Sequence, residues 1–153
     1  MTRHSERIGR LGEFAVASWL SEYTDLVNLI PHGSHADIIF EYDKDLYKCQ
    51  VKTVTKEKKY VSKYTGRHYR SGWCWDLRRG ANTRDRDYYD QIDIYALYCK
   101  EVNKIFWISA KNLKKTKHTL TAKALQDINS YETWIDACEQ TKKFIKANIL
   151  KKN

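Results

Sequence analysis

Short runs rich in β-branched and aromatic residues constrain the fold of this chain more than any other feature. Five such runs stand at 26–30, 36–41 (ADIIFE), 46–54 (LYKCQVKTV), 92–99 (IDIYALYC) and 104–109 (KIFWIS). Apolar runs of this length, bounded by turn residues, are typical of strands. Turn residues at 42–45 and 101–103 join neighbouring runs, so we expect two antiparallel hairpins within one sheet.

Helical periodicity appears only near the two ends of the chain. Near the N-terminus, Ile8, Leu11, Ala15, Trp19 and Tyr23 form one helical stripe and predict a helix over 7–22 with Ser5 as its N-cap. A second helix is predicted at about 131–150. The order of helix, several strands and helix indicates an α/β protein with a mixed sheet. With 153 residues, of which 42% are hydrophobic, we expect a single domain over 1–153.

Several protein classes are disfavoured by the composition. No apolar run approaches the roughly 20 residues that cross a bilayer, and the first residues lack the apolar stretch of a secretory signal. The four cysteines are scattered, so neither a zinc site nor a disulfide scaffold is indicated. Cys49 and Cys99 lie inside apolar runs and are interpreted as core residues. We expect a cytoplasmic protein in a reducing compartment, with no membrane partner.

Positive charge is concentrated in one part of the chain. The formal net charge is +9, and the window 56–87 holds ten basic and four acidic residues together with five aromatic ones. Segments 58–64 and 67–75 are predicted as two strands joined at Thr65–Gly66, forming a ribbon that can enter the major groove of DNA. The residues expected to contact nucleic acid are Lys59, Lys63, Arg67, Arg70, Arg78 and Arg79. A solvated charged surface is the alternative interpretation.

Four polar residues outside that window suggest a catalytic site: Glu13, Asp37, Gln50 and Lys52. Alternation places Lys48, Gln50 and Lys52 on one face of 46–54, which is an unusual choice for a central strand unless that face lines a site. The hairpin can bring Asp37 to the same end of the sheet. Carboxylate and amide oxygens suit Mg²⁺, and a lysine can hold an attacking water or offset charge on phosphorus. The alternative is an ordinary exposed strand face with solvated carboxylates.

This arrangement resembles the PD-(D/E)xK nuclease superfamily. The resemblance rests on Asp37 followed by Gln50–Val51–Lys52, after a helix that bears Glu13. The short length, the neutral Gln50 and the strand pair YALYCKEVNKIFWIS resemble a narrower group, the small homing endonucleases of bacterial group I introns.

The resemblance implies a restriction-endonuclease-like α/β fold. Its expected features are a single domain, a central mixed β-sheet flanked by helices and an inserted basic β-ribbon. The implied parts are a catalytic core at about 5–54 and 90–110, a DNA-binding insertion at about 55–90 and the C-terminal helix at about 131–150.

The same resemblance implies a role for each site residue. Asp37, Glu13 and Gln50 would bind Mg²⁺, for which Mn²⁺ could substitute, and Lys52 would be the catalytic lysine. The sequence departs from the family pattern in having Ala36 before the aspartate and Gln50 in place of an acidic ligand. The implied activity is site-specific cleavage of double-stranded DNA by a homodimer or homotetramer.

Two alternative functions remain. A Holliday-junction resolvase or another structure-specific nuclease on the same fold also fits, because its first helix opens with a pair like Gly12–Glu13. The other is a non-catalytic DNA-binding protein, in which the face bearing Lys52 has no chemical role.

Overall fold

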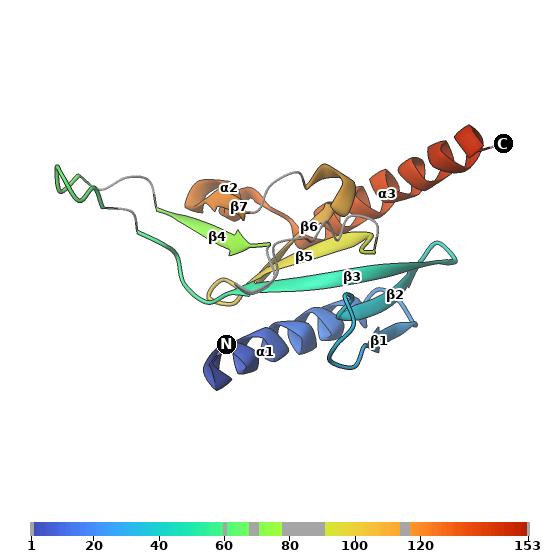
Figure 1. Cartoon of the computed structure of the whole chain (residues 1–153), viewed down its shortest axis with the longest axis horizontal. Helices are drawn as coiled ribbons and strands as arrows, with labels where there is room; N and C mark the ends of the chain where they lie inside the picture. Colours follow the sequence, from blue (N-terminus) through green and yellow to red (C-terminus); the bar gives the residue numbers. More distant parts are fainter. Residues whose placement is uncertain (1, 60, 68–70, 78–90, 114–116, 153) are drawn as a thin grey trace.

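The computed structural model describes residues 2–59, 61–67, 71–77, 91–113 and 117–152 (Figure 1). The elements in chain order are α1 (Arg3–Leu20), β1 (Val27–Leu29), β2 (Ile38–Tyr42), β3 (Asp45–Val54), β4 (Gly72–Asp76), β5 (Ile94–Cys99), β6 (Lys104–Ser109), the 3₁₀ helix η2 (Ala110–Asn112), β7 (Lys117–Thr121), α2 (Ala122–Asp127) and α3 (Ser130–Lys152). No helix within these ranges is both long enough and apolar enough to span a bilayer.

Five strands form the central sheet in the order β1-β2-β3-β5-β6. The pairs β1–β2, β2–β3 and β5–β6 are antiparallel, whereas β3 and β5 run parallel, so the sheet is mixed. Strands β4 and β7 form a separate antiparallel pair. The α/β fold class expected from the sequence, with a central mixed sheet flanked by helices, is confirmed.

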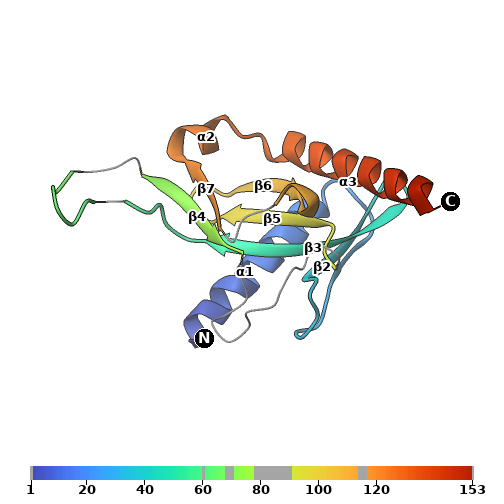
Figure 2. The same ribbon diagram turned by 45° about the horizontal axis from the view of Figure 1, so that its top comes forward.

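Separate apolar clusters lie on the two faces of this sheet. One face packs against α1 and α3, and its cluster includes Cys49 and Val51 of β3. The other face is covered by β4 and by α2, whose Leu125 joins Trp73 and Trp75 in the second cluster (Figure 2). Since alternate residues of a strand point to opposite faces, Gln50 and Lys52 belong to this second face. Their register partners are Tyr95 and Leu97, which both lie in the second cluster.

Helix α1 begins earlier than its apolar stripe predicts. Its N-cap is Thr2, whose hydroxyl accepts a hydrogen bond from the backbone N–H of Ser5, so the prediction of Ser5 as the cap is wrong. Along the helix, Gly12, Val16 and Leu20 are buried at four-residue spacing. A Cβ atom built on Gly12 would lie 1.7 Å from Thr53 Oγ1, so only glycine allows this approach of α1 to β3.

Between β3 and β4, the described residues 55–59, 61–67 and 71 form an extended arm, which projects to one side in Figures 1 and 2. Its two legs meet at Lys58 and Gly72, which exchange two backbone hydrogen bonds, and a turn closes at 62–67. The antiparallel ribbon expected for 58–64 and 67–75 is therefore present at Lys58–Gly72 and at the turn, but the rest of the second leg does not pair with the first. Residues 72–76 pair instead with β7, which leads directly into α2.

Candidate active site

Asp37 lies where β2 begins, and its carboxylate is tied to the neighbouring strand. Asp37 Oδ2 accepts a hydrogen bond from the backbone N–H of Val51 over 2.7 Å. The Asp37 N–H donates to the carbonyl of Cys49 over 2.9 Å, and its own carbonyl accepts from Ile30 N–H. The side chain therefore takes the place of a main-chain acceptor opposite Val51, the residue between Gln50 and Lys52.

Glu13 approaches Asp37 from α1. Gly12 brings the helix against Thr53, and Glu13 is the next residue, half-buried beside β3. Burial raises the pKa of the Glu13 carboxyl, and the negative charge of Asp37 raises it further, against the opposing effects of His32 and Arg10. The carboxylates of Glu13 and Asp37 therefore repel each other, and a cation bound between them would relieve this repulsion.

Gln50 supplies an oxygen that the surrounding protein leaves unused. Its side chain is 7% exposed, and its Oε1 atom is buried without a hydrogen-bond partner. A buried amide oxygen left in this state is destabilising by about 1–3 kcal/mol unless a ligand or water satisfies it. Two carboxylates and a neutral oxygen are donors that suit a hard divalent cation such as Mg²⁺. The types of donor present therefore suit a magnesium ion, with Glu13 and Asp37 close together and Gln50 on the face of β3 that α1 does not cover.

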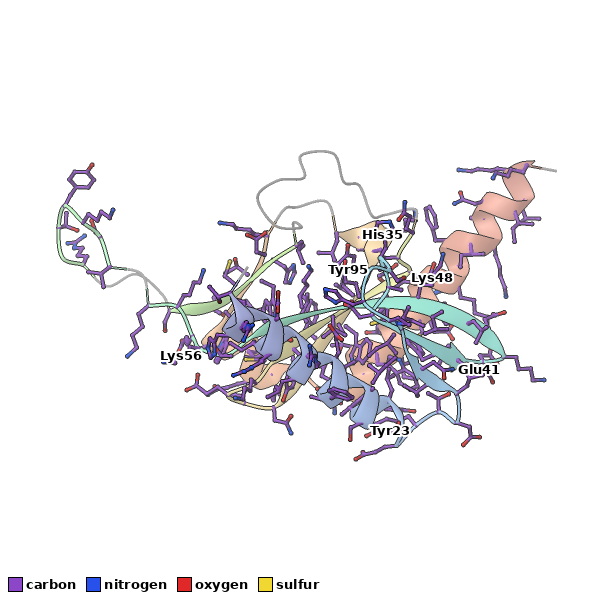
Figure 3. All side chains as sticks on the ribbon, turned by 60° about the horizontal axis from the view of Figure 1, so that its bottom comes forward. Tyr23, His35, Glu41, Lys48, Lys56 and Tyr95 are labelled. Carbon is purple, nitrogen blue, oxygen red and sulfur yellow. The ribbon has the colours of Figure 1, made fainter. Side chains whose placement is uncertain are left out.

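Lys52 follows two residues later on the same face of β3 and is half-buried. In Figure 3, Lys48 and Tyr95 are labelled on this part of the sheet, where Lys48 is exposed and Tyr95 is buried. On the opposite face of β3, Tyr47, Cys49 and Val51 belong to the first apolar cluster. The polar face is more buried than expected at Gln50, since Tyr95 and Leu97 of β5 lie beside it.

A cluster of at least three His, Cys, Asp or Glu side chains arranged as metal ligands does not occur in the described part of the chain. The candidate site contains only two residues of these types, Glu13 and Asp37, and depends on the amide of Gln50 for a third donor. The neutral glutamine thus makes this site less recognisable than an all-acidic one.

The expected DNA contacts are only partly visible. Lys59, Lys63 and Arg67 are exposed and belong to the arm, which projects away from β2 in Figure 1. The other three residues, Arg70, Arg78 and Arg79, lie outside the described residues.

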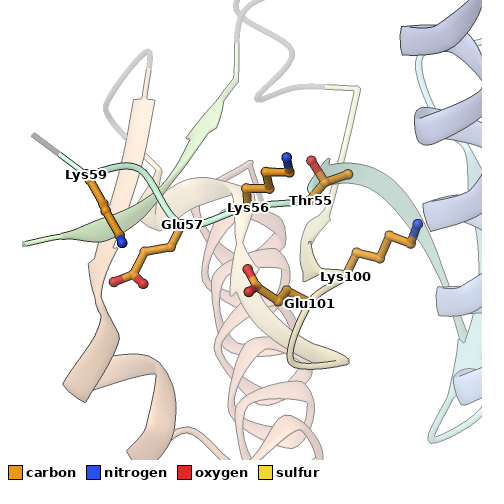
Figure 4. A pocket seen from close by; sticks show the side chains of 6 residues that line it. All are labelled: Thr55, Lys56, Glu57, Lys59, Lys100 and Glu101. Atoms are coloured by element: carbon orange, nitrogen blue, oxygen red, sulfur yellow. The ribbon is translucent and has the colours of Figure 1, made fainter.

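A groove at the base of the arm adds candidates that the sequence analysis missed. It has a volume of about 570 Å³ and is lined by Thr55, Lys56, Glu57, Lys59, Lys100 and Glu101 (Figure 4). The backbone N–H of Lys100 donates to the carbonyl of Val54, which brings the turn after β5 beside the strand that leads into the arm. Lys100 could not be assigned from sequence, because it lies more than 40 residues beyond Lys56 along the chain.

Comparison with known proteins gives two positive findings. A family model described as PD-(D/E)XK endonuclease matches residues 3–140. Among solved structures, that of a bacterial homing endonuclease, I-Ssp6803I, is similar with a TM-score of 0.57 at 17% sequence identity, covering 88% of this chain and 93% of that one. No curated protein matches by sequence.

Proposed function

The chain belongs to the PD-(D/E)XK endonuclease family, and from this premise we propose that it is a metal-dependent, site-specific endonuclease that cuts both strands of DNA, as a homing endonuclease does. The proposal is carried by one observation: the Asp37 carboxylate is bound to the Val51 amide between Gln50 and Lys52, with Glu13 beside it. The similarity to a homing endonuclease supports the choice within the nucleases.

Asp37, Glu13 and Gln50 would hold Mg²⁺, or Mn²⁺ in its place. Bound there, the ion would polarise the scissile phosphate and lower the pKa of a water molecule. The carboxylates would be fully ionised with the cation present, since it offsets the repulsion that raises the pKa of Glu13.

Lys52 would act on the water or on the phosphate. A half-buried ammonium group on the face of β3 that carries Gln50 can orient a water molecule or stabilise negative charge that develops on phosphorus. Lys52 lies two residues from Gln50, so the spacing of the strand sets the distance between these two residues. The hydrogen bond between Asp37 and Val51 holds the aspartate against the same part of β3.

DNA would be held chiefly by the arm, through Lys59, Lys63 and Arg67 and through the three arginines outside the described residues. One site cuts one strand, so cleavage of a duplex calls for a homodimer or homotetramer with sites on opposite strands. We propose a reducing intracellular compartment, because the four cysteines are scattered along the sequence and do not form the dense pattern of a disulfide scaffold.

Sequencing of DNA ends tests the proposal. The wild-type protein is incubated with Mg²⁺ and a pool of bacterial genomic DNA and four-way junctions. Recurrent ends at one long duplex sequence are expected. Lys52→Ala and Asp37→Ala should each reduce cutting at least about 100-fold, because each removes a group acting on the transition state. Lys48→Ala is the matched control, because Lys48 is an exposed lysine of the same strand face, and it should cut normally.

Other outcomes favour the alternatives. Ends confined to four-way junctions would make the protein a resolvase. If no ends depend on Lys52 and neither Mg²⁺ nor Mn²⁺ changes thermal stability in the presence of DNA, a non-catalytic DNA-binding protein is favoured. A salt dependence of log binding shallower than about −3 would indicate too few phosphate contacts for the proposed arm.

A further inference from the structure

The solvent face of α1 carries a stripe of arginines, defined here as Arg3, Arg7 and Arg10. Spacings of four and three residues place all three on one side of the helix. This side is opposite the buried residues Gly12 and Val16. All three arginines are exposed, and no ion pair or hydrogen bond from their side chains is found in the described structure.

The stripe is unfavourable for the helix that bears it. Arg3 and Arg7 are like charges four residues apart, a spacing that destabilises an isolated helix, and Glu6 of the first turn offsets only part of this cost. Both also lie toward the N-terminal end of α1, where the helix dipole disfavours cations. The buried face gains nothing from them, because Gly12, Val16 and Leu20 make its contacts. An anionic partner would offset both penalties.

The stripe lies close to the candidate active site. Arg10 is near enough to Glu13 to lower the pKa of its carboxyl, so the stripe ends beside the proposed metal ligand. Figure 3 shows Lys56, which leads into the arm, at the end of the molecule where α1 begins, and Tyr23 at the end where α1 finishes. The arm projects toward this same end in both ribbon views.

Arginine is also the side chain best suited to a phosphodiester. Its planar guanidinium binds phosphate oxygens through two parallel hydrogen bonds and is less strongly hydrated than an ammonium group. The exposed aromatic ring of Phe14, four residues beyond Arg10, extends the same side of the helix. We infer that the arginine stripe is a second DNA-binding surface, which holds the sugar-phosphate backbone of the duplex beside Glu13. This inference rests on the proposed endonuclease function.

Salt-dependent binding to duplex DNA tests it. Kd is measured by fluorescence anisotropy with a labelled 30-base-pair duplex from 50 to 200 mM KCl, without divalent metal, in the Lys52→Ala background so that nothing is cut. Replacing the three stripe arginines by glutamine should make the slope of log binding against log salt shallower by about 2 to 3, since each phosphate contact contributes about 0.9. Glutamine has nearly the same helix propensity as arginine, so folding should persist.

Two matched variants separate a local surface from general charge. Replacing Lys143, Lys146 and Lys151 of α3 by glutamine removes the same charge from the far end of the molecule and should change the slope by less than about 1. Replacing the stripe arginines by lysine should keep the slope yet weaken binding several-fold, because the bidentate contact is lost. Circular dichroism and thermal melting check that each variant is folded.

The outcomes distinguish this inference from the proposed function. An unchanged slope in the glutamine variant of the stripe, with normal wild-type binding, overturns the inference alone. Equal effects of the α1 and α3 variants also overturn it, because they would show a response to net charge. If the wild type neither binds duplex DNA nor cuts it, the proposed function fails and the inference fails with it. Should the triple variant unfold, Arg7→Gln and Arg10→Gln singly should each reduce the slope by about 1.

Discussion

Helices α1 and α3 pack on the same face of the central sheet, yet they meet it in different ways. Helix α1 presents Gly12, and the absent side chain lets its backbone approach Thr53. Helix α3 presents the large ring of Trp134, and its last turns, with Ile149 and Leu150, remain exposed. Close approach through glycine fixes the position of a neighbouring residue, whereas bulky packing mainly buries apolar area. The difference places Glu13 in the candidate site and leaves α3 as the cover of the core.

The two helices also differ in the type and position of their basic residues. Helix α1 has arginines and no lysine, while the basic residues of α3 are all lysines, located after its buried part. Lys142 of α3 pairs with Asp43 in the turn between β2 and β3. Lysines on the exposed end of a helix also suit the negative end of its dipole, so those near the C-terminus of α3 need no ligand to explain them.

The largest difference between the helices should appear in catalysis. Glu13→Gln is expected to reduce DNA cleavage at least about 100-fold, because it removes one of two carboxylates proposed to hold the metal. Glu139→Gln in α3 should cut within about twofold of the wild type, since the amide oxygen can still accept the hydrogen bond from Tyr42. Initial rates on one duplex substrate at saturating Mg²⁺ measure both. Equal losses of cleavage rate in the two variants would contradict a specific role of Glu13 in the candidate site.

Close packing of α1 gives the next largest effect. Gly12→Ala should lower the free energy of unfolding by about 1–3 kcal/mol, because the added methyl group overlaps Thr53 Oγ1. Thr53→Ala in the same chain should restore part of that loss. Gly9→Ala is the control on the same helix, since nothing lies within 4 Å of the added atom, and it should be neutral or stabilising. Urea unfolding of the three variants and the wild type measures these differences, and similar losses for Gly9→Ala and Gly12→Ala would contradict the packing argument.

On α3 the anchoring contact is polar and its effect should be smaller. Thr141 is buried, and its hydroxyl lies 2.8 Å from both Ser109 Oγ and the carbonyl of Ala137. Thr141→Val keeps the shape and removes these bonds, which should lower the free energy of unfolding by about 1 kcal/mol. Cleavage per folded molecule should stay unchanged. A catalytic defect without a loss of stability would show that α3 contributes to the site after all.

The smallest expected effect is a pH dependence of opposite sign for the two helices. The pKa of Glu13 is raised, so the metal-free protein is most stable with this carboxyl protonated, and stability falls as pH rises above the ordinary value of 4.5. The pKa of Asp43 is lowered by Lys142, so the contribution of that pair is complete above the ordinary value of 3.8 and is lost as pH falls through the lower pKa of the folded state.

Urea midpoints from pH 3 to 8, measured without divalent metal, test both signs. As pH rises toward the pKa of Glu13 in the folded state, the wild type should lose stability relative to Glu13→Gln. For Asp43→Asn the change should run the other way and should vanish in high salt, since the pair with Lys142 is exposed. A pH-independent difference for Glu13→Gln would show that burial and Asp37 do not perturb this carboxyl.

The elements that could be predicted are those whose pattern reflects burial. Strand β6 (Lys104–Ser109) matches its expected range, and β5 (Ile94–Cys99) is buried throughout, as a continuous apolar run between other strands requires. Strand β7 escaped prediction because its exposed residues, Lys117 and Thr119, make it resemble a loop. The pairing of residues 72–76 with β7 was not predicted, because the alternation of Trp73 and Trp75 marks a strand and does not identify its partner.

The candidate site shows the same limit. A hairpin and the order of residues were enough to predict that Asp37 would lie beside Gln50 and Lys52. The unpartnered Oε1 of Gln50 could not be predicted, because its burial depends on Tyr95, which a parallel crossover brings beside it. The arginine stripe was missed for a different reason: charge was counted along the chain, where three arginines over eight residues do not stand out.

The hydrogen bond from Val51 to Asp37 has a consequence for when activity can arise. It links a carboxylate proposed for catalysis to the register of β2 against β3. A slip of one residue would turn Lys52 to the other face and would move Val51 away from the aspartate. An unfolded or misfolded chain therefore lacks a complete candidate active site. If the protein is the endonuclease proposed above, DNA cleavage therefore depends on the correct register of β2 against β3.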